Sequence, residues 1–410
     1  MKKLLVIFGM LVAMNANAQW VQVLSGMGNV SIYSLTISGN NLFAGTADEG
    51  VYLSTNNGQN WVQKGLENQM IRSLAVSGSN IFAGAQIIGV FRSTNNGINW
   101  QITLNENKSP NALATNENYI FAGTNFYGLY LSTNYGENWT QTAVTNTVRA
   151  IAISGNNVYA GTSTGIIIST NNGQNWTING LNNVGVISIA ISGNNIYAGS
   201  TAQGVYLSTN NGINWSKTNL INKTVYSIVI TGDNIFAGTA GEGVYHSTNN
   251  GQNWIQKNEG FVGTNSFGAL LIANDYIFAG SFNSQSVWRR SLWEIITGAQ
   301  IISLDIPSSY SLQQNYPNPF NPTTKIKFDV APSLSFPLAK QIRKAFSIGN
   351  PVTLKVYDVM GREIQTLVNE SLKPGTYEAT FDGSMLNSGV YFYKLQAGNF
   401  TATKKLTLLK

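Results

Sequence analysis

The sequence predicts an all-β protein made of a seven-bladed β-propeller followed by a small immunoglobulin-like β-sandwich. Two markers indicate the propeller: an Ala-Gly step recurs seven times at intervals of 38 to 42 residues, and a tryptophan recurs seven times at intervals of 37 to 39 residues. Each interval contains four short runs of strand-forming residues, without helical periodicity. Four strands per unit at such a period are typical of propeller blades. An open β-solenoid is the alternative.

The N-terminal residues have the pattern of a secretory signal peptide. Lys2 and Lys3 precede an apolar run at 4–14, and Ala16 and Ala18 occupy the positions usual before a cleavage site. We expect residues 1–18 to be removed and Gln19 to be the mature N-terminus. No later apolar run is long enough for a membrane-spanning helix, so we expect export without such an anchor.

The propeller is predicted over residues 19–296. In the first unit the four strands are expected at 33–37, 41–44, 51–53 and 61–63, separated by turn residues. Residues 20–23 (Trp-Val-Gln-Val) copy the fourth strand ahead of that unit. Because an unpaired strand edge invites association, we expect this spare strand to cover the edge of the last blade and close the ring.

The turn between the third and fourth strands, Ser-Thr-Asn-Asn-Gly-Gln-Asn-Trp in the first unit, occurs six times. Asn and Gly tolerate positive φ, so each copy predicts a tight turn. The pattern resembles the Asp-box of sialidase-type propellers, Ser-x-Asp-x-Gly-x-Thr-Trp, with Asn at the Asp position. In that family the box is a structural turn far from the catalytic centre. The resemblance implies structural roles for Asn56, Gly58, Trp61, Asn95, Gly97, Trp100, Asn134, Gly136, Trp139, Asn171, Gly173, Trp176, Asn210, Gly212, Trp215, Asn249, Gly251 and Trp254.

The repeats also show which face of the propeller varies. Strands alternate in direction, so the nearly constant turns after the first and third strands share one face. The loops after the second and fourth strands share the other, and they differ in every unit. We call the latter the variable face. Divergence there, on a constant framework, marks the place where recognition is built.

At the start of each first strand, where the variable face meets the central channel, seven aligned residues are candidates for a ligand site. Arginine can grip an anion by bidentate hydrogen bonding and tyrosine can stack on a sugar; the alternative is that these side chains only fill and solvate the channel mouth. The aligned residues are Tyr33, Arg72, Asn111, Arg149, Ile187, Tyr226 and Gly268. We predict ligand binding by Tyr33, Arg72, Asn111, Arg149 and Tyr226, with Phe126 and Tyr127 from a neighbouring loop.

Catalytic residues are not predicted. A sialidase-like site needs three arginines, and only Arg72 and Arg149 share the aligned position; most other glycosidases need two carboxylates at a defined separation. His246, the only histidine, occupies a strand position held elsewhere by Leu, Ile or Arg, and we expect a structural role. A hydrolase or lyase acting on polysaccharide stays open, with its site among the nearby acids Asp48, Glu49, Glu67 and Glu242.

Composition excludes several other functions. The chain lacks cysteine, which removes disulfides and thiolate chemistry; we expect neither a cofactor nor a metal. Residues 19–309 carry ten basic and twelve acidic side chains, whereas residues 310–410 carry twelve and six. The basic character therefore belongs to the C-terminal part, and we do not expect a nucleic-acid partner for the propeller.

Residues 297–309 are predicted to be a linker, and residues 310–410 a second domain with short alternating strands between Gly and Pro turns. This domain resembles the C-terminal type A sorting domain of the type IX secretion system. The resemblance implies that the translocon and sorting machinery are partners, and that the chain reaches the outer-membrane surface of a Gram-negative cell, there to be attached to lipopolysaccharide or released. The implied signal residues are Gly389, Tyr391, Lys394, Lys404, Lys405 and Lys410.

Together these features predict a secreted or surface-bound propeller that recognises a glycan or a protein without catalysis. The polysaccharide-acting enzyme is one alternative. A structural adhesion or surface-layer protein is another, because a scaffold of this kind does not fix a function.

Overall fold

The computed structural model describes residues 19–105, 108–178, 180–263, 265–297, 299–303, 307–332, 350–372, 374–384 and 386–410. They form two compact units, one of Trp20–Leu292 and one that contains Trp293–Lys410. The predicted signal peptide, 1–18, lies outside the described residues.

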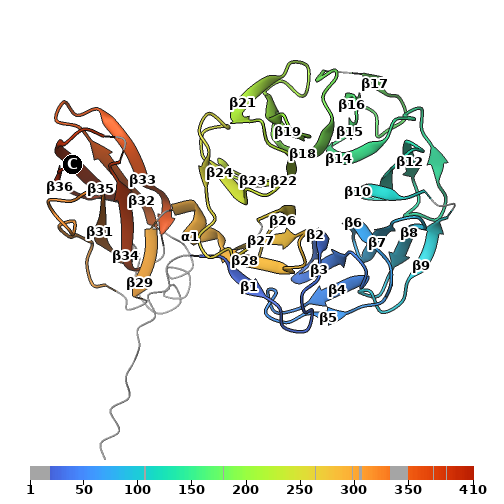
Figure 1. Ribbon diagram of the computed structural model, residues 1–410, viewed down its shortest axis with the longest axis horizontal. Coiled ribbons are helices and arrows are strands. Elements are labelled where there is room, and N and C mark those ends of the chain that lie inside the picture. Colours follow the sequence, from blue (N-terminus) through green and yellow to red (C-terminus); the bar gives the residue numbers. More distant parts are fainter. Residues whose placement is uncertain are drawn as a thin grey trace, which may run out of the picture. The chain divides into compact units, whose positions relative to one another are not determined.

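The unit Trp20–Leu292 contains seven four-stranded antiparallel sheets arranged in a ring (Figure 1). The innermost strands are β2 (Ile32–Ser38), β6 (Ile71–Ser77), β10 (Pro110–Asn116), β14 (Val148–Ser154), β18 (Val186–Ser192), β22 (Val225–Thr231) and β26 (Phe267–Ala273). The second strands are β3 (Asn41–Thr46), β7 (Asn80–Ala85), β11 (Tyr119–Thr124), β15 (Asn157–Thr162), β19 (Asn195–Ser200), β23 (Asn234–Thr239) and β27 (Tyr276–Ser281).

The outer half of each sheet completes the blade. The third strands are β4 (Val51–Ser54), β8 (Gly89–Ser93), β12 (Leu129–Ser132), β16 (Gly165–Ser169), β20 (Gly204–Ser208), β24 (Val244–Ser247) and β28 (Val287–Ser291). The outermost strands are β5 (Val62–Gln63), β9 (Gln101–Leu104), β13 (Thr140–Gln141), β17 (Thr177–Ile178), β21 (Ser216–Ile221) and β25 (Ile255–Gln256), and in the seventh sheet β1 (Val21–Val23).

The predicted closure of the ring is confirmed. β1 pairs with β28 through Val21 and Arg289, so the N-terminal strand completes the last sheet. Trp20 is 2% exposed, stacks on Phe261 with ring centroids 4.8 Å apart, and donates its Nε1–H to the carbonyl of Lys257 at 2.6 Å. β26 also packs beside β2, which closes the inner circle.

An aromatic residue of each second strand fills the space between neighbouring blades. In the first blade Phe43 packs in one cluster with Ile71 and Ile81 of the second blade. Large side chains removed from water on all sides contribute most to such a core. The seven members of the series are nearly fully buried: Phe43, Phe82, Phe121, Tyr159, Tyr197, Phe236 and Phe278.

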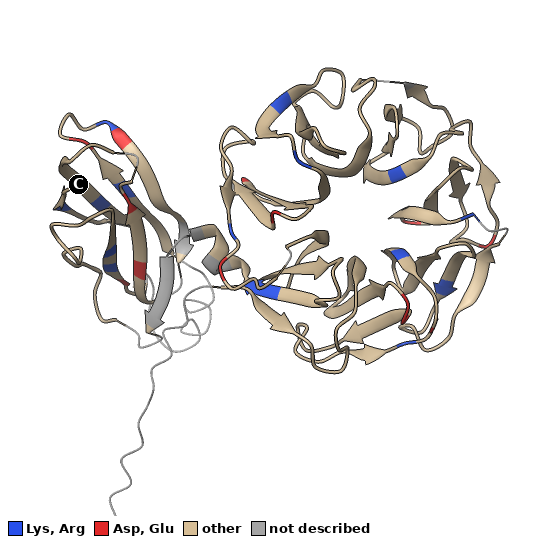
Figure 2. Ribbon diagram, viewed as in Figure 1, with Lys and Arg blue, Asp and Glu red and all other residues tan. Residues whose placement is uncertain are grey.

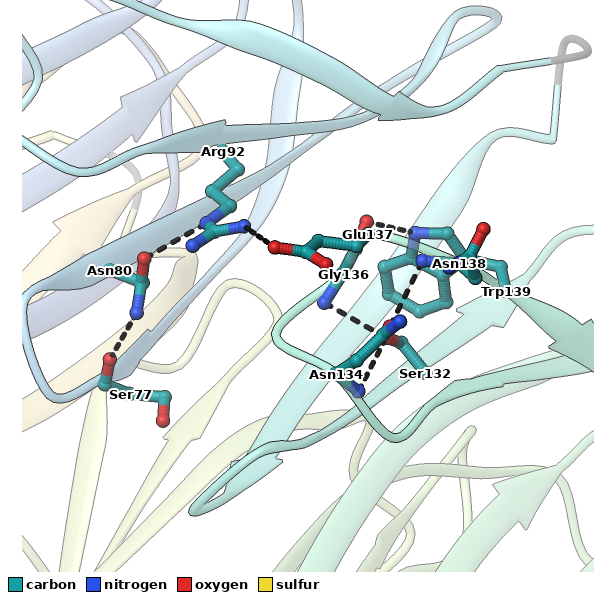
Figure 3. A network of polar contacts seen from close by, with 9 residues as sticks. All are labelled: Ser77, Asn80, Arg92, Ser132, Asn134, Gly136, Glu137, Asn138 and Trp139. Carbon is teal, nitrogen blue, oxygen red and sulfur yellow. Dashed lines mark hydrogen bonds and ion pairs between the residues drawn. The ribbon is translucent and has the colours of Figure 1, made fainter.

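The repeated turn is held by a serine and an asparagine, as the third blade shows (Figure 3). Ser132 donates its hydroxyl to Asn134 Oδ1 at 3.0 Å and accepts the Gly136 N–H at 2.8 Å. Asn134 Oδ1 also accepts the Asn138 N–H at 3.0 Å. The Gly positions have positive φ, as predicted. These bonds satisfy the backbone donors of the turn without a charged side chain.

The unit that contains Trp293–Lys410 has two four-stranded antiparallel sheets around one apolar core. Its elements are α1 (Leu292–Thr297, beginning at the end of the ring unit), β29 (Ala299–Ser303), β30 (Ser311–Leu312), β31 (Thr323–Val330), β32 (Asn350–Tyr357), β33 (Glu363–Leu372), β34 (Gly375–Asp382), β35 (Gly389–Ala397) and β36 (Phe400–Leu408). The sheet orders are β29-β34-β31-β30 and β33-β32-β35-β36. The immunoglobulin-like topology stays a prediction.

Two expectations need correction. The segment 297–309, predicted as a linker, contains β29, which pairs with β34; its run of Ile301 and Ile302 favours a strand over a linker. The seventh repeating tryptophan, Trp293, lies in α1 and not in an outer strand. The turn of that repeat is four residues shorter than in the others, and β1 takes the outer position in its place.

Candidate functional site

Each of the seven aligned residues is the extra residue of a β-bulge. In the first sheet Ile32 pairs with Thr46 and Ser34 pairs with Gly45, so Tyr33 between them has no partner on β3. The other six innermost strands have the same register shift. A bulge re-aims the side chain of its extra residue and is common beside functional sites. We call these seven positions the bulge residues.

The bulge residues converge on one cavity of about 560 Å³. Residues from the loops of the variable face complete its wall. The lining is Tyr33, Arg72, Gln86, Ser109, Asn111, Asn125, Arg149, Ile187, Tyr226, Gly268 and Phe282. The five bulge residues predicted to bind a ligand therefore come together.

Among the described residues that line the cavity, the only charged side chains are the two arginines, and charged residues are sparse over the ring of sheets as a whole (Figure 2). Arg72 donates its Nε–H to Gln86 Oε1 at 2.6 Å, and its guanidinium carbon lies 5.3 Å from the centroid of the Tyr33 ring. These contacts orient Arg72 and leave its terminal NH₂ groups to a ligand. Arg149 is exposed and has no hydrogen-bond or ion-pair partner in the part of the chain that the structure describes.

Another part of the lining is aromatic. Phe282 contacts Tyr33 and Tyr226, with centroid distances of 4.9 Å to each. It follows β27 on the variable face and was not predicted. The bulge residue of its own sheet is Gly268, where a Cβ would lie 1.9 Å from the Phe282 ring. In the sequence, the glycine at position 268 was the sign that a side chain from elsewhere fills this part of the lining.

Phe126 and Tyr127, also predicted to bind a ligand, do not line the cavity. Tyr127 is 43% exposed and its ring holds Lys108 Nζ at 4.4 Å from the centroid. Phe126 is 78% exposed, although the preceding residue, Asn125, does line the cavity. These two aromatic residues therefore belong to the surrounding rim.

Hydroxyl residues just before the innermost strands tie the rim loops together. Ser109 accepts the Ile87 N–H at 3.0 Å on its hydroxyl and the Asn125 N–H at 3.2 Å on its carbonyl, which joins the loops of the second and third sheets. Thr224 joins the fifth and sixth sheets in the same way, through the N–H groups of Ala202 and Ala240. Hydrogen bonds thus join two pairs of neighbouring rim loops, which limits the freedom of these loops before a ligand binds.

The acidic residues considered for catalysis do not reach the cavity. Glu49 accepts a hydrogen bond from the Tyr52 hydroxyl, and Glu242 accepts one from Tyr245 at 2.7 Å. The hydrogen bond from Lys223 to Glu242, at 2.5 Å, lowers the pKa of that carboxyl, while burial and then Glu242 raise the pKa of Tyr245 to about 12. Asp48 and Glu67 are not in the lining either.

His246 is part of the blade. Its ring is stacked on Phe236 with centroids 4.5 Å apart, and its Nε2 lies 2.9 Å from Asn234 Oδ1. Burial, followed by the charges of Lys257 and Arg290, lowers the pKa of His246 to about 3. Among the described residues there is no group of three or more His, Cys, Asp or Glu side chains that could hold a metal ion.

The predicted sorting residues lie on the last hairpin. Gly389, Tyr391 and Lys394 belong to β35, and Lys404 and Lys405 to β36, which pairs with it. Lys410 donates its Nζ to the carbonyl of Ser384 at 2.6 Å. Tyr391 donates its hydroxyl to the carbonyl of Asn387 at 2.8 Å. Across the described ranges of the chain, no helix is long and apolar enough to cross a membrane.

Solved structures similar to this chain are β-propellers. YCF48 from Cyanidioschyzon merolae matches with a TM-score of 0.54 and 15% identity over 67% of this chain and 98% of that chain. The WD40 β-propeller domain of Doa1 matches with a TM-score of 0.53 and 12% identity over 66% of this chain and 96% of that one. The extracellular domain of the hybrid two-component system BT3049 from B. thetaiotaomicron matches with a TM-score of 0.56 and 14% identity over 96% and 58% of the two chains. These likenesses show the fold.

No curated protein matches the sequence. Residues 314–408 match the family described as secretion system C-terminal sorting domain. The chain is therefore an all-β protein whose seven propeller-like sheets are accompanied by a type IX sorting domain, and it is secreted or carried to the outer-membrane surface.

Proposed function

We propose that the protein is a secreted, non-catalytic recognition module that binds an anion-bearing ligand, on a glycan or a protein, at the mouth of the central cavity. The observation that carries the proposal is the described cavity lining, in which two arginines are the only charged side chains. Arg72 is pre-oriented and Arg149 is free of protein partners among the described residues. Two guanidinium groups, one of them held in place by its neighbours, suit a carboxylate or a sulfate.

The absence of carboxylates from the described part of the cavity lining supports binding over hydrolysis. Glycoside hydrolysis generally needs a pair of carboxyl groups beside the bond to be broken. We also propose that the repeated turns, which a serine and an asparagine hold by hydrogen bonds, are Asp-box-like and serve only as framework. After secretion, the sorting domain is proposed to be cleaved and the propeller to be attached to lipopolysaccharide or released.

The test is a binding screen of the purified protein against acidic and neutral glycans and envelope proteins, with released reducing ends measured in the same wells. We expect binding without release. For a ligand found this way, Arg72→Gln with Arg149→Gln should weaken binding at least about tenfold, because a hydrogen bond to a charged group contributes about 1.5–3 kcal/mol. Lys217→Gln, on an outermost strand, removes a positive charge elsewhere and should not weaken it. Release of reducing ends, or equal affinity in all variants, would overturn the proposal.

A further inference from the structure

Beside the cavity, the loop between β11 and β12 holds an aromatic side chain in a strained and exposed position. Phe126 is 78% exposed and has a φ of 102°. A bulky residue rarely adopts positive φ, and such strain persists only where the surrounding structure imposes it. Burial does not account for the ring, since most of it faces solvent. A strained, solvent-facing aromatic next to a cavity points to a ligand contact.

The loop is fixed from several directions. Thr124 donates its hydroxyl to the carbonyl of Gly128 at 2.8 Å and accepts the Tyr127 N–H at 3.2 Å. The N–H of Asn125 donates to the carbonyl of Ser109 at 3.2 Å. These bonds surround Phe126 on both sides, so its backbone is set before any ligand arrives. Little ordering entropy is then lost on binding.

Neighbouring side chains leave the Phe126 ring open. The adjacent aromatic, Tyr127, is occupied by Lys108, whereas Phe126 has no ring contact among the described residues. Ile87, on the loop of the second sheet, is 64% exposed and also has positive φ, 70°. Both loops are held by Ser109. Ile87 and Phe126 thus lie on joined loops, each next in sequence to a residue of the cavity wall, Gln86 or Asn125.

We propose that the ligand is a linear acidic polysaccharide, with the carboxylate of one uronate residue at Arg72 and Arg149 and the next sugar stacked on Phe126; this rests on the proposed function. Gln86, Asn111 and Asn125 are neutral amides that can both donate to and accept from sugar hydroxyls. An exposed aromatic ring offers a flat apolar face to the C–H face of a sugar. The cavity thus forms an inner subsite and Phe126 an outer one, which favours a chain over a single sugar.

The test compares monogalacturonate with a linear tetragalacturonate by calorimetry. We expect the tetramer to bind more tightly than the monomer. Phe126→Gly, which suits the positive φ, should weaken tetramer binding about tenfold, consistent with an aromatic contact of about 1.5 kcal/mol, and leave monomer binding unchanged. Phe126→Trp should retain tetramer affinity. The matched control is Tyr135→Gly, which removes another exposed aromatic of positive φ from the same sheet, in its turn on the constant face.

The outcomes separate the inference from the proposed function. If Arg149→Gln weakens the monomer but Phe126→Gly leaves the tetramer unchanged, the outer subsite is wrong and the proposed function stands. Equal binding of a neutral tetrasaccharide, or tighter binding of a sulfated tetrasaccharide or an acidic peptide, overturns the uronate class. Uronate binding that does not depend on either arginine overturns both proposals.

Discussion

At the residue scale, Gly268 and Phe282 act as a pair in the aromatic side of the cavity. Gly268 is the one bulge residue without a side chain, and Phe282 occupies the vacated space between Tyr33 and Tyr226. A methyl group at 268 and the ring at 282 cannot both keep their positions. The residue that fits at one of these two positions therefore depends on the residue at the other.

We expect Gly268→Ala to lower the free energy of unfolding by about 1–3 kcal/mol, the usual cost of overpacking. In the Phe282→Ala background the same change should cost much less, because the ring that it would meet is gone. Urea unfolding of the two single variants and the double variant measures this coupling. Additive effects would show that Phe282 can move aside without loss, contrary to its placement between two tyrosines.

His246 should make the stability of the propeller depend on pH. Its pKa of about 3 in the folded protein is below the usual value near 6.5 in an unfolded chain. Below pH 6.5 the imidazole is therefore protonated in the unfolded state but neutral in the folded state. The free energy of unfolding falls as pH is lowered toward 3. Since the charges of Lys257 and Arg290 also lower the pKa of His246, protonation of the ring would add a positive charge where two already act on it.

From pH 7 to pH 5 we expect the free energy of unfolding to fall by about 2 kcal/mol through His246. His246→Leu places in the sixth blade the residue that the first, third and fifth blades have at this position, and it should remove that part of the pH dependence. Urea unfolding at the two pH values checks both proteins. The same loss of stability in the variant would assign the effect to other groups.

At the scale of elements, β1 is the closing strand of the ring. It is short, but Trp20 ahead of it is buried and its indole N–H is hydrogen-bonded to Lys257. The closure therefore depends as much on one buried ring as on the backbone pairing with β28. Trp100 makes the equivalent bond between the first and second blades, from its Nε1–H to the carbonyl of Lys64 at 2.7 Å.

Trp20→Ala should destabilise the propeller by about 3–5 kcal/mol, the usual cost of removing a large aromatic side chain from a core. The backbone amides of β28 should then exchange with deuterium faster than those of an interior third strand such as β16, because the seventh sheet would lose its outer strand. Hydrogen exchange of the two proteins measures this. Equal protection of β28 in both would mean that closure does not require Trp20.

Most elements of the ring could be predicted from the sequence, because the seven blades share one strand pattern and six of them share one turn sequence. The bulges could not be predicted, since a bulge is a property of the register between two strands. The only sign of them in the sequence was the small residue that follows each bulge position, such as Ser34 or Ser73. Phe282 was missed because the loop that carries it diverges from the other units. The strand β29 was missed because its short sequence does not indicate that it pairs with β34.

The predicted ligand residues divided into two groups for a related reason. The periodic bulge residues met in one cavity because repetition places equivalent residues on one circle. Phe126 and Tyr127 came from a loop whose sequence differs in every unit, so their distance from that circle depended on local backbone angles, including the positive φ of Phe126. The repeat period predicts where a residue lies around the ring, whereas the loop conformation decides whether its side chain reaches the cavity.

At the scale of the whole molecule, the chain combines a ring of propeller-like sheets with a sorting domain that matches over residues 314–408. The last strand of that domain, β36, has a buried side and an exposed side. Leu406 and Leu408 are fully buried in the core of the domain, whereas Lys405 is exposed on the same strand. Deleting β36 would therefore unfold the domain, and a loss of export after deletion would not identify a signal.

Charge substitutions separate the signal from the fold. Lys404→Ala with Lys405→Ala keeps the buried leucines and the pairing of β36 with β35. Lys404 is half-buried and Lys405 is exposed, so the domain should stay folded, with a loss of stability of about 1 kcal/mol or less. If these lysines are read by the sorting machinery, the surface-exposed fraction of the protein should fall severalfold while the periplasmic fraction rises. Fractionation of cells with protease accessibility measures this.

The matched control is Lys355→Ala on β32 of the same sheet, whose Nζ pairs with Glu363 at 2.8 Å near the surface. An isolated surface pair of this kind contributes at most about 1 kcal/mol, so export of the control should be unchanged. Unchanged export of the Lys404 and Lys405 variant would remove these two charges from the signal, and recognition would then rest on the shape of the hairpin or on Lys410. A parallel loss in the control would show that sorting responds to the net charge of the sheet and not to the last strand.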